Sequence, residues 1–240
     1  MKSNAEVLLQ IKNINVRYGG VEALKGVSLE IHDGQTVTLI GANGAGKTTL
    51  INTISGLNVP RSGEIWFDGQ RVDGLQPHEI AHLGVRQVPE GRKIFQTLTV
   101  MENLLIGSYT QRNPAKTELN LKRIFQLFPV LRERRNLRGG NLSGGEQQML
   151  AVGRALMASP KLLMMDEPTL GLSPLMCRRV GEIVEEIHQT GIGILLVEQN
   201  ARMALKLASQ GFVLQTGEII RKGEAKDLAQ DEYLKQTYLS

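Results

Sequence analysis

The segment "TVTLIGANGAGKTTL", residues 36–50, carries the strongest chemical signal in the chain. Its spacing fits G-x-x-x-x-G-K-[ST], and it follows an apolar, strand-like run and precedes a helix-compatible one. Small residues let backbone N–H groups curl around phosphate oxygens, and a helix N-terminus adds partial positive charge. We therefore expect Lys47 to reach the β- and γ-phosphates of a nucleotide and Thr48 to ligate Mg²⁺, the alternative being a glycine-rich turn without a ligand. The predicted phosphate loop comprises Gly41, Ala42, Asn43, Gly44, Ala45, Gly46, Lys47, Thr48 and Thr49.

A second apolar run, "LLMMDEP", ends in two adjacent carboxylates, Asp166 and Glu167. At the end of a buried strand, Asp166 can hold Mg²⁺ through its water shell. Glu167 can polarise an attacking water as a general base. A strand that merely reaches solvent is the alternative, and the phosphate loop weighs against it.

The third motif, "NLSGGEQQMLAVGRAL", begins with a capping box in which Ser143 is the N-cap and Glu146 lies three residues later. A cap alone does not need two glycines, each of which costs about 1 kcal/mol relative to Ala in a helix interior. Free N–H groups at the start of a helix suit a phosphate. The motif therefore indicates a helix start that can also meet an anion.

The elements that must position these residues follow from the apolar pattern. The first 72 residues alternate like strands, and Asp33-Gly34 and Asp68-Gly69 each predict a hairpin. The pattern is helical over about 99–158, with a break at Pro129. The runs 161–166 and 193–198 flank a helix-like segment and predict a parallel α/β sheet, and 211–220 predicts a last hairpin.

Bulk composition limits the function classes. A chain of 240 residues suits one large domain, and its single cysteine excludes an intrachain disulfide. The net charge of +4 is too small to argue for nucleic acid, although residues 112–138 hold eight Lys or Arg against two Glu. That segment is either a solvated helical face or a patch for an acidic partner or anionic lipid. Without a secretory signal or a run near the ~18 apolar residues that span a bilayer, we expect a cytosolic chain unless a partner holds it at a membrane.

With these three motifs in this order, the chain resembles the ATP-binding subunits of ABC transporters over essentially all of its 240 residues. The resemblance implies an α/β fold: a P-loop NTPase (RecA-like) core with a parallel sheet, an antiparallel β subdomain and an inserted α-helical subdomain. Within a single domain, 1–240, the core and β subdomain would occupy 1–87 and 157–240, and the helical subdomain 88–156.

The resemblance also implies partners and further site residues. Two such subunits would sandwich two ATP molecules with Mg²⁺, each ATP lying between one phosphate loop and the other subunit's signature motif. Tyr18 matches the aromatic residue that stacks on adenine, although alone it could be a strand-end aromatic. The signature motif comprises Ser143, Gly144, Gly145 and Glu146.

Three positions depart from the family's usual pattern. Glu90, in "RQVPEGRKIF", replaces the usual Gln that approaches Mg²⁺, with Gln87 three residues upstream as the alternative. Ser173 precedes Pro174 where Asp is usual. Gln199, in "GILLVEQN", replaces the usual His near the γ-phosphate, where it can orient water but cannot carry a positive charge. A strand that simply surfaces is the alternative for Gln199.

These departures resemble one subset, the second ATPase of bacterial branched-chain amino acid importers. The resemblance implies membrane permease subunits, a second ATP-binding subunit (a homodimer or a heterodimer) and, indirectly, an extracytoplasmic substrate-binding protein. It places the chain peripherally on the cytoplasmic face of the bacterial inner membrane.

Three alternatives stay open at the level of sequence. The same ATPase could serve another cargo, such as urea, short amides or a lipid-like molecule. The chain could be a catalytically weak partner in an ATPase heterodimer. An ATPase acting on DNA or ribosomes is disfavoured, because the chain has one phosphate loop, no long heptads and no zinc-type cysteines.

Overall fold

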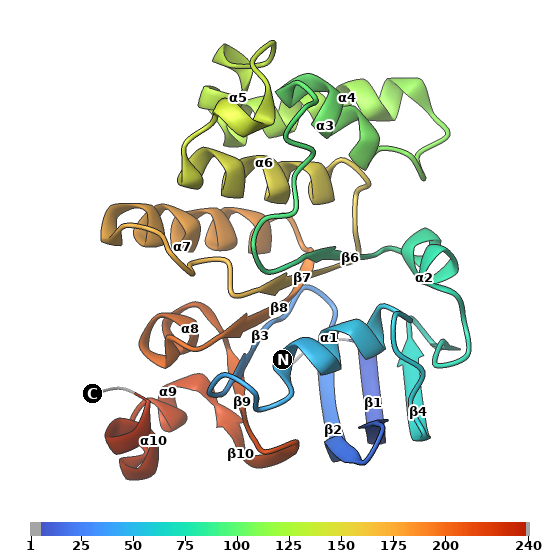
Figure 1. Cartoon of the computed structure of the whole chain (residues 1–240), viewed down its shortest axis with the longest axis vertical. Coiled ribbons are helices and arrows are strands. Elements are labelled where there is room, and N and C mark those ends of the chain that lie inside the picture. Colours follow the sequence, from blue (N-terminus) through green and yellow to red (C-terminus); the bar gives the residue numbers. More distant parts are fainter. Residues whose placement is uncertain (1–5, 239–240) are drawn as a thin grey trace.

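A computed structural model describes residues 6–238, which build two sheets and a stack of helices (Figure 1). The larger sheet has six strands in the order β10-β9-β3-β8-β7-β6. Its strands are β3 (Thr36–Ile40), β6 (Val85–Val88), β7 (Leu162–Asp166), β8 (Gly193–Glu198), β9 (Gln210–Gln215) and β10 (Glu218–Glu224). The pairs β9–β3, β3–β8, β8–β7 and β7–β6 are parallel, and only β10 runs antiparallel at one edge.

The predicted parallel α/β sheet is confirmed, and the burial of its strands explains its position. Every residue of β3, β7 and β8 is buried. Strands that are apolar on both faces need cover on both faces, which a parallel sheet inside an α/β domain provides. Because the strands are parallel, the carboxyl ends of β3, β7 and β8 meet at one edge of the sheet.

The smaller sheet is antiparallel and has the order β2-β1-β4-β5. It consists of β1 (Val7–Tyr18), β2 (Val21–His32), β4 (Ser62–Phe67) and β5 (Gln70–Arg71). Asp68 and Gly69 both have positive φ, as a tight two-residue hairpin loop requires, and Phe67 pairs with Gln70. The predicted hairpins at 68–69 and near the chain end, where β9 pairs with β10, are confirmed.

The hairpin predicted at Asp33-Gly34 is wrong. The two residues do reverse the chain, with Gln35 N–H donating to the His32 carbonyl, but β2 pairs with β1 while β3 pairs with β8 and β9. The Asp33-Gly34 dipeptide therefore indicates a local turn, but it does not indicate which strand pairs with β3. Exposed residues alternate with buried ones in β2, whereas β3 is buried throughout, and this difference places the two strands in different sheets.

The helices gather mainly on one side of the six-stranded sheet. In Figure 1, α3, α4 and α5 lie farthest from the four-stranded sheet, and α6 and then α7 lie between them and the six-stranded sheet. The break predicted at Pro129 is confirmed, because α4 ends at Leu127 and α5 begins at Pro129. The helices are α1 (Lys47–Ile54), α2 (Pro77–Leu83), α3 (Val100–Gly107), α4 (Pro114–Leu127), α5 (Pro129–Glu133), α6 (Gly144–Leu156), α7 (Pro174–His188), α8 (Ala201–Leu207), α9 (Ala225–Leu228) and α10 (Glu232–Thr237), with a 3-10 turn at Gly139–Asn141.

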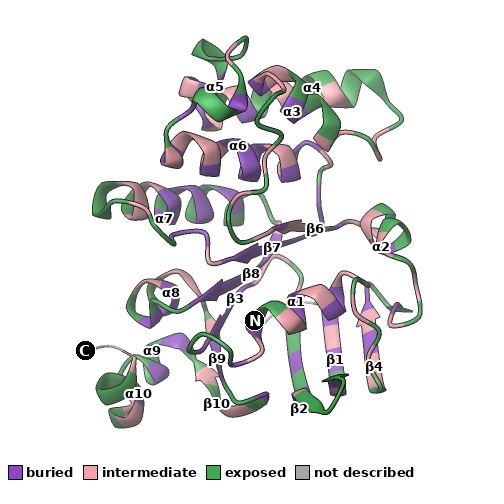
Figure 2. Cartoon of the chain, in the orientation of Figure 1, coloured by how far each residue is buried: buried purple, intermediate pink, exposed green. Residues whose placement is uncertain are grey.

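Two aliphatic cores lie on opposite faces of the six-stranded sheet, and buried residues run along both (Figure 2). Successive residues of β7 alternate between the cores, with Leu163 and Met165 in one and Leu162 and Met164 in the other. This is the period of two that a strand imposes. The sheet is thereby held rigidly between the helices on one face and α1 with the small sheet on the other.

Within residues 6–238, none of the helices has the length and apolar character needed to cross a membrane.

Candidate functional site

The predicted phosphate loop connects the end of β3 to the start of α1. A Cβ on Gly41 would lie 2.5 Å from the Leu214 carbonyl oxygen, and one on Gly46 would lie 2.7 Å from the Ala23 carbonyl oxygen. Gly46 also has φ +110 at the N-cap of α1, which favours glycine. The two glycines of the motif are thus required by close backbone packing, and between them Ala42, Asn43 and Gly44 are exposed.

Lys47 is the buried cation of the loop. Its Nζ donates to the carbonyls of Gly41, at 2.7 Å, and Ala42, at 3.1 Å, and lies 3.0 Å from Glu167 Oε1. The Lys47 and Glu167 side chains are only 5% and 8% exposed. Such a buried pair is partly desolvated, so an anion that enters here competes for a cation already held in position.

Asp166 is a buried carboxylate at the end of β7. Neither of its oxygens has a hydrogen-bond partner within residues 6–238. Burial raises the pKa of Asp166, the nearby carboxylates of Glu90 and Glu167 raise it further, and the Thr48 hydroxyl lowers it. The Thr48 hydroxyl, although outside hydrogen-bond distance, and the two carboxylates are near enough to shift this pKa, so three predicted site residues lie around Asp166.

Gln87, the alternative to Glu90, points elsewhere. Its side chain accepts from Ser55 Oγ at 3.1 Å and donates to Asn52 Oδ1 at 3.5 Å, at the end of α1. Glu90 is exposed, two residues beyond the end of β6. The geometry therefore favours Glu90 as the acidic neighbour of Asp166.

Glu167 has a left-handed backbone, with φ +47, and its N–H donates to the Val197 carbonyl at 2.8 Å. A left-handed backbone conformation costs a non-glycine residue about 1 kcal/mol or more of free energy, and it persists where the surrounding structure enforces it. The bend turns the Glu167 side chain to Lys47, whereas a regular strand would place Asp166 and Glu167 on opposite faces.

Glu198 is a residue of this site that the sequence reasoning did not single out. It is 2% exposed at the end of β8, and its Oε1 accepts from Thr169 Oγ1 at 2.7 Å and from Thr169 N–H at 3.2 Å. Burial raises the pKa of Glu198, and Glu167 raises it further. The available sequence signal was an acidic residue that directly continues an apolar strand, whereas its partner Thr169 lies 29 residues earlier in the chain.

Gln199 follows Glu198 directly and is exposed. The register pairs Glu198 with Ile40 and Val197 with Asp166, so Gln199 emerges between the phosphate loop and the Asp166-Glu167 pair. The Asn200 side chain caps α8 by accepting from Met203 N–H at 3.2 Å. Asn200 therefore has a structural role, whereas the exposed Gln199 side chain does not cap the helix. Gln199 thus lies at the same edge of the sheet as the phosphate loop and the Asp166-Glu167 pair.

The signature motif begins α6, and its predicted capping box is confirmed. Ser143 N–H donates to Glu146 Oε2 at 2.8 Å, and Glu146 N–H donates to Ser143 Oγ at 3.4 Å. Ser143 is exposed, whereas Gly145 is buried against Met176 of α7. Within residues 6–238, no hydrogen bond or ion pair joins the motif to the phosphate loop. Figure 1 shows α6 well apart from α1, with α7, β6 and β7 between them, so one chain does not bring the two together.

Tyr18 ends β1 and is 50% exposed. Its hydroxyl accepts from Asn58 Nδ2 at 2.6 Å. This bond fixes the edge of the ring and leaves the exposed aromatic surface available for stacking.

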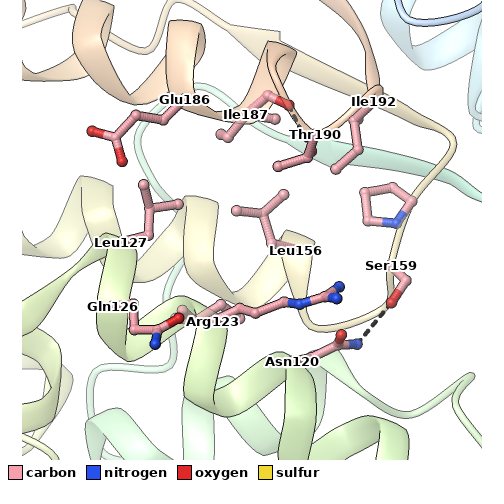
Figure 3. Close-up of a pocket in the computed structure, with 12 residues that line it drawn as sticks. Asn120, Arg123, Gln126, Leu127, Leu156, Ser159, Glu186, Ile187, Thr190 and Ile192 are labelled. Carbon is pink, nitrogen blue, oxygen red and sulfur yellow. Dashed lines mark hydrogen bonds between the residues drawn. The ribbon is translucent and has the colours of Figure 1, made fainter.

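A groove of about 700 Å³ lies elsewhere, between α4, the end of α6 and the end of α7 (Figure 3). Leu127, Leu156 and Ile187 give it an apolar floor, and the bond from Asn120 Nδ2 to Ser159 Oγ, at 2.8 Å, crosses one end. None of the predicted site residues lines this groove.

The chain matches the family model described as "ABC transporter" over residues 24–170. It is 43% identical to the high-affinity branched-chain amino acid transport ATP-binding protein BraG of Pseudomonas aeruginosa, over 97% of this chain and 99% of that one. It is 34% identical to the probable branched-chain amino acid transport ATP-binding protein LivF of Archaeoglobus fulgidus, over 94% and 95%. Among solved structures, the ADP conformation of MJ1267, an ATP-binding cassette of an ABC transporter, matches with a TM-score of 0.84 and 29% identity, over 98% and 99%.

Proposed function

The chain belongs to the ABC transporter family of ATP-binding subunits, and from that premise we propose that it hydrolyses ATP to power import of branched-chain amino acids through a separate permease. One observation carries the proposal. The phosphate loop, Asp166 and Glu167 converge at the carboxyl edge of the sheet in a chain that is 43% identical to a branched-chain amino acid transport ATP-binding protein. Ligands of open α/β sheets bind at this edge.

In this proposal the nucleotide's phosphates take the place of the Gly41 and Ala42 carbonyls as partners of Lys47. The Lys47 ammonium is already buried and oriented, so little reorganisation is needed to meet the new charge. Once the phosphates bind Lys47, Glu167 is released from the ion pair. Its carboxylate then accepts a proton from the attacking water.

The residues around Asp166 fit Mg²⁺. A buried carboxylate with two unpaired oxygens is costly unless a cation compensates it, and Mg²⁺ typically binds one or two carboxylates together with substrate phosphates. Residues 6–238 contain no group of three or more His, Cys, Asp and Glu side chains that could hold a metal alone, which agrees with a metal that arrives with the nucleotide. We assign Thr48, Asp166 and Glu90 as its ligands, directly or through water; when bound, it neutralises phosphate charge.

Gln199 is assigned to the terminal phosphate and the attacking water. Its amide can donate to a phosphate oxygen and accept from water at once, which neither the buried Glu198 nor the capping Asn200 is free to do. Glu198 holds Thr169 and thereby fixes the segment after Glu167.

The signature motif completes the site of a second subunit. Exposed Ser143 and the first N–H groups of α6 suit a phosphate, yet α6 lies apart from this chain's own loop at the start of α1 (Figure 1). We propose a sandwich of two ATP-binding subunits, identical or different, in which residues 88–156 form the helical lobe and Tyr18 stacks on adenine.

The cargo, permease and location are inferred from the relatives. Both relatives named above are branched-chain amino acid transport ATP-binding proteins. The proposal places this chain peripherally at the cytoplasmic face of the inner membrane, bound to permease subunits and acting indirectly with a substrate-binding protein.

The direct test has two stages. Purified chain is expected to hydrolyse ATP with a dependence on Mg²⁺, and Lys47→Ala is expected to abolish both binding and turnover. Uptake of labelled leucine is then measured in vesicles that contain the chain and the permease that co-purifies with it. Uptake of urea or a short amide in place of leucine would refute the cargo while leaving the ATPase intact.

A further inference from the structure

We propose that Arg92 is a further nucleotide-binding residue, whose guanidinium meets the terminal phosphate of the ATP held by the partner subunit's phosphate loop. The inference rests on the proposed sandwich of two ATP-binding subunits and names an additional cation for it. Arg92 lies outside the phosphate loop, the signature motif and the Asp166-Glu167 pair.

The first observation is the place of the side chain. A Cβ added to Gly144 would lie 3.1 Å from both Nη1 and Nη2 of Arg92, so the guanidinium rests against the first residue of α6. Arg92 is half-buried there. Its one hydrogen bond within residues 6–238 is a long one, from Nη1 to Gln147 Oε1 at 3.4 Å. A guanidinium has five N–H donors, so most of its capacity is uncommitted.

The second observation is electrostatic. The N-terminus of a helix carries partial positive charge, so a cation placed against it is destabilised unless an anion compensates. Glu146 is the acidic side chain of the first turn, but its Oε1 lies 3.1 Å from Arg134 Nε. Arg134 therefore neutralises Glu146, and the charge of Arg92 is left in surplus beside Ser143. A phosphate that approaches this end of α6 would meet both the helix and a fork-shaped cation suited to it.

The third observation is that the Arg92 loop is held in place on both sides. Gly91, Arg92 and Lys93 all have positive φ, and Arg154 of α6 donates from Nη2 to the Lys93 carbonyl at 2.7 Å. Further along, Asn103 of α3 exchanges two hydrogen bonds of 2.9 Å with the Phe95 backbone. The guanidinium is thus positioned before any ligand arrives, and the same loop leads back to Glu90.

The test measures ATP-driven association of the full chain in the Glu167→Gln background, with Mg²⁺, by analytical ultracentrifugation. It is repeated with the second ATP-binding subunit added if the chain does not pair with itself. ATP binding to the separate subunit is measured in parallel. Arg92→Ala is expected to raise the ATP concentration for half-association by about tenfold or more, the usual effect of losing a hydrogen bond to a charged group, without changing ATP binding to the separate subunit.

Three further variants decide between a direct and a purely structural role. Arg92→Gln keeps a polar N–H donor but lacks the charge, and it is expected to behave like Arg92→Ala. Arg92→Lys is expected to recover part of the loss. The matched control is Arg132→Ala on α5, an exposed arginine whose side chain makes no hydrogen bond or ion pair within residues 6–238, and it is expected to associate like the parent.

The outcomes separate the inference from its premise. Parent-like association of Arg92→Ala, or of Arg92→Gln, would overturn the role of Arg92 and leave the sandwich standing. No ATP-driven association of the parent, with itself or with a second subunit, would overturn the proposed sandwich, and Arg92's role with it.

Discussion

The two ends of the proposed site are built in opposite ways. At the phosphate-loop end, charges are buried and already paired with each other, as Lys47 and Glu167 are, and rigid strand ends position them. At the signature end, Ser143 is exposed, Arg92 is unmatched, and a helix with a strained loop positions them. The first end resembles a complete half-site awaiting a ligand, and the second resembles a surface awaiting a partner.

This difference indicates a division of labour. Burial at the phosphate-loop end excludes water and strengthens the electrostatic interactions that chemistry needs. Exposure at the signature end suits a contact that forms and breaks in each cycle. Variants at the first end should therefore change turnover, and variants at the second should change association or the stability of the lobe that carries it.

The largest expected effect is on turnover. Glu167→Gln should lower kcat by about 10³-fold, since a general base contributes roughly 10²–10⁴-fold, while ATP binding persists. Steady-state phosphate release and equilibrium ATP binding measure the two quantities. Loss of ATP binding together with turnover would mean that Glu167 mainly holds Lys47 in position. The phosphate-loop end would then not be specialised for chemistry as proposed.

A second variant examines how the helical lobe is held. A Cβ on Gly107 would lie 2.0 Å from the Arg154 carbonyl oxygen, where α3 packs on α6. Gly107→Ala should destabilise the chain by about 3 kcal/mol, the upper part of the usual range for overpacking. Gly181→Ala in α7 is the matched control, because its Cβ would meet Leu207 at an ordinary 3.6 Å, and it should stabilise by about 0.5–1 kcal/mol. Urea unfolding measures both, and equal effects would refute the close α3–α6 contact.

Gln199→Ala should lower kcat about 10²-fold, as loss of one preorganised donor does. Turnover by Gln199→His is the sharper comparison, because a histidine can add a positive charge that Gln lacks. Full activity of Gln199→Ala would mean that Gln199 is polar only because β8 ends at the protein surface there.

The two ends of the site also differ in how far the sequence predicts them. Lys47, Asp166 and Glu167 lie in short motifs at the ends of apolar runs, and parallel strands bring such ends together, so local pattern sufficed. Arg92 and Glu198 depend on what packs against them: Arg92 on Gln147, 55 residues later, and Glu198 on Thr169. The false hairpin at Asp33-Gly34 has the same cause, because a turn signal carries no information about which strand pairs with which.

The smallest expected effect concerns pH. Burial raises the pKa of Glu198 in the folded chain above its ordinary value of 4.5, so the folded state binds the proton more tightly than the unfolded state does. Folding stability should therefore fall as pH rises from about the ordinary value through the raised one, because the carboxylate must then be charged while buried.

Glu198→Gln removes this titration and can keep an acceptor for Thr169. Its free energy of unfolding should change less with pH across that window than the wild type's, with equal or slightly greater stability at pH 7. Asp166 also has a raised pKa and is present in both proteins, so the difference between the two curves isolates Glu198. Denaturant unfolding at a series of pH values gives the curves. Superimposable curves would mean that Glu198 titrates as it does in water, and that its pairing with Thr169 does not hold a desolvated charge beside Glu167.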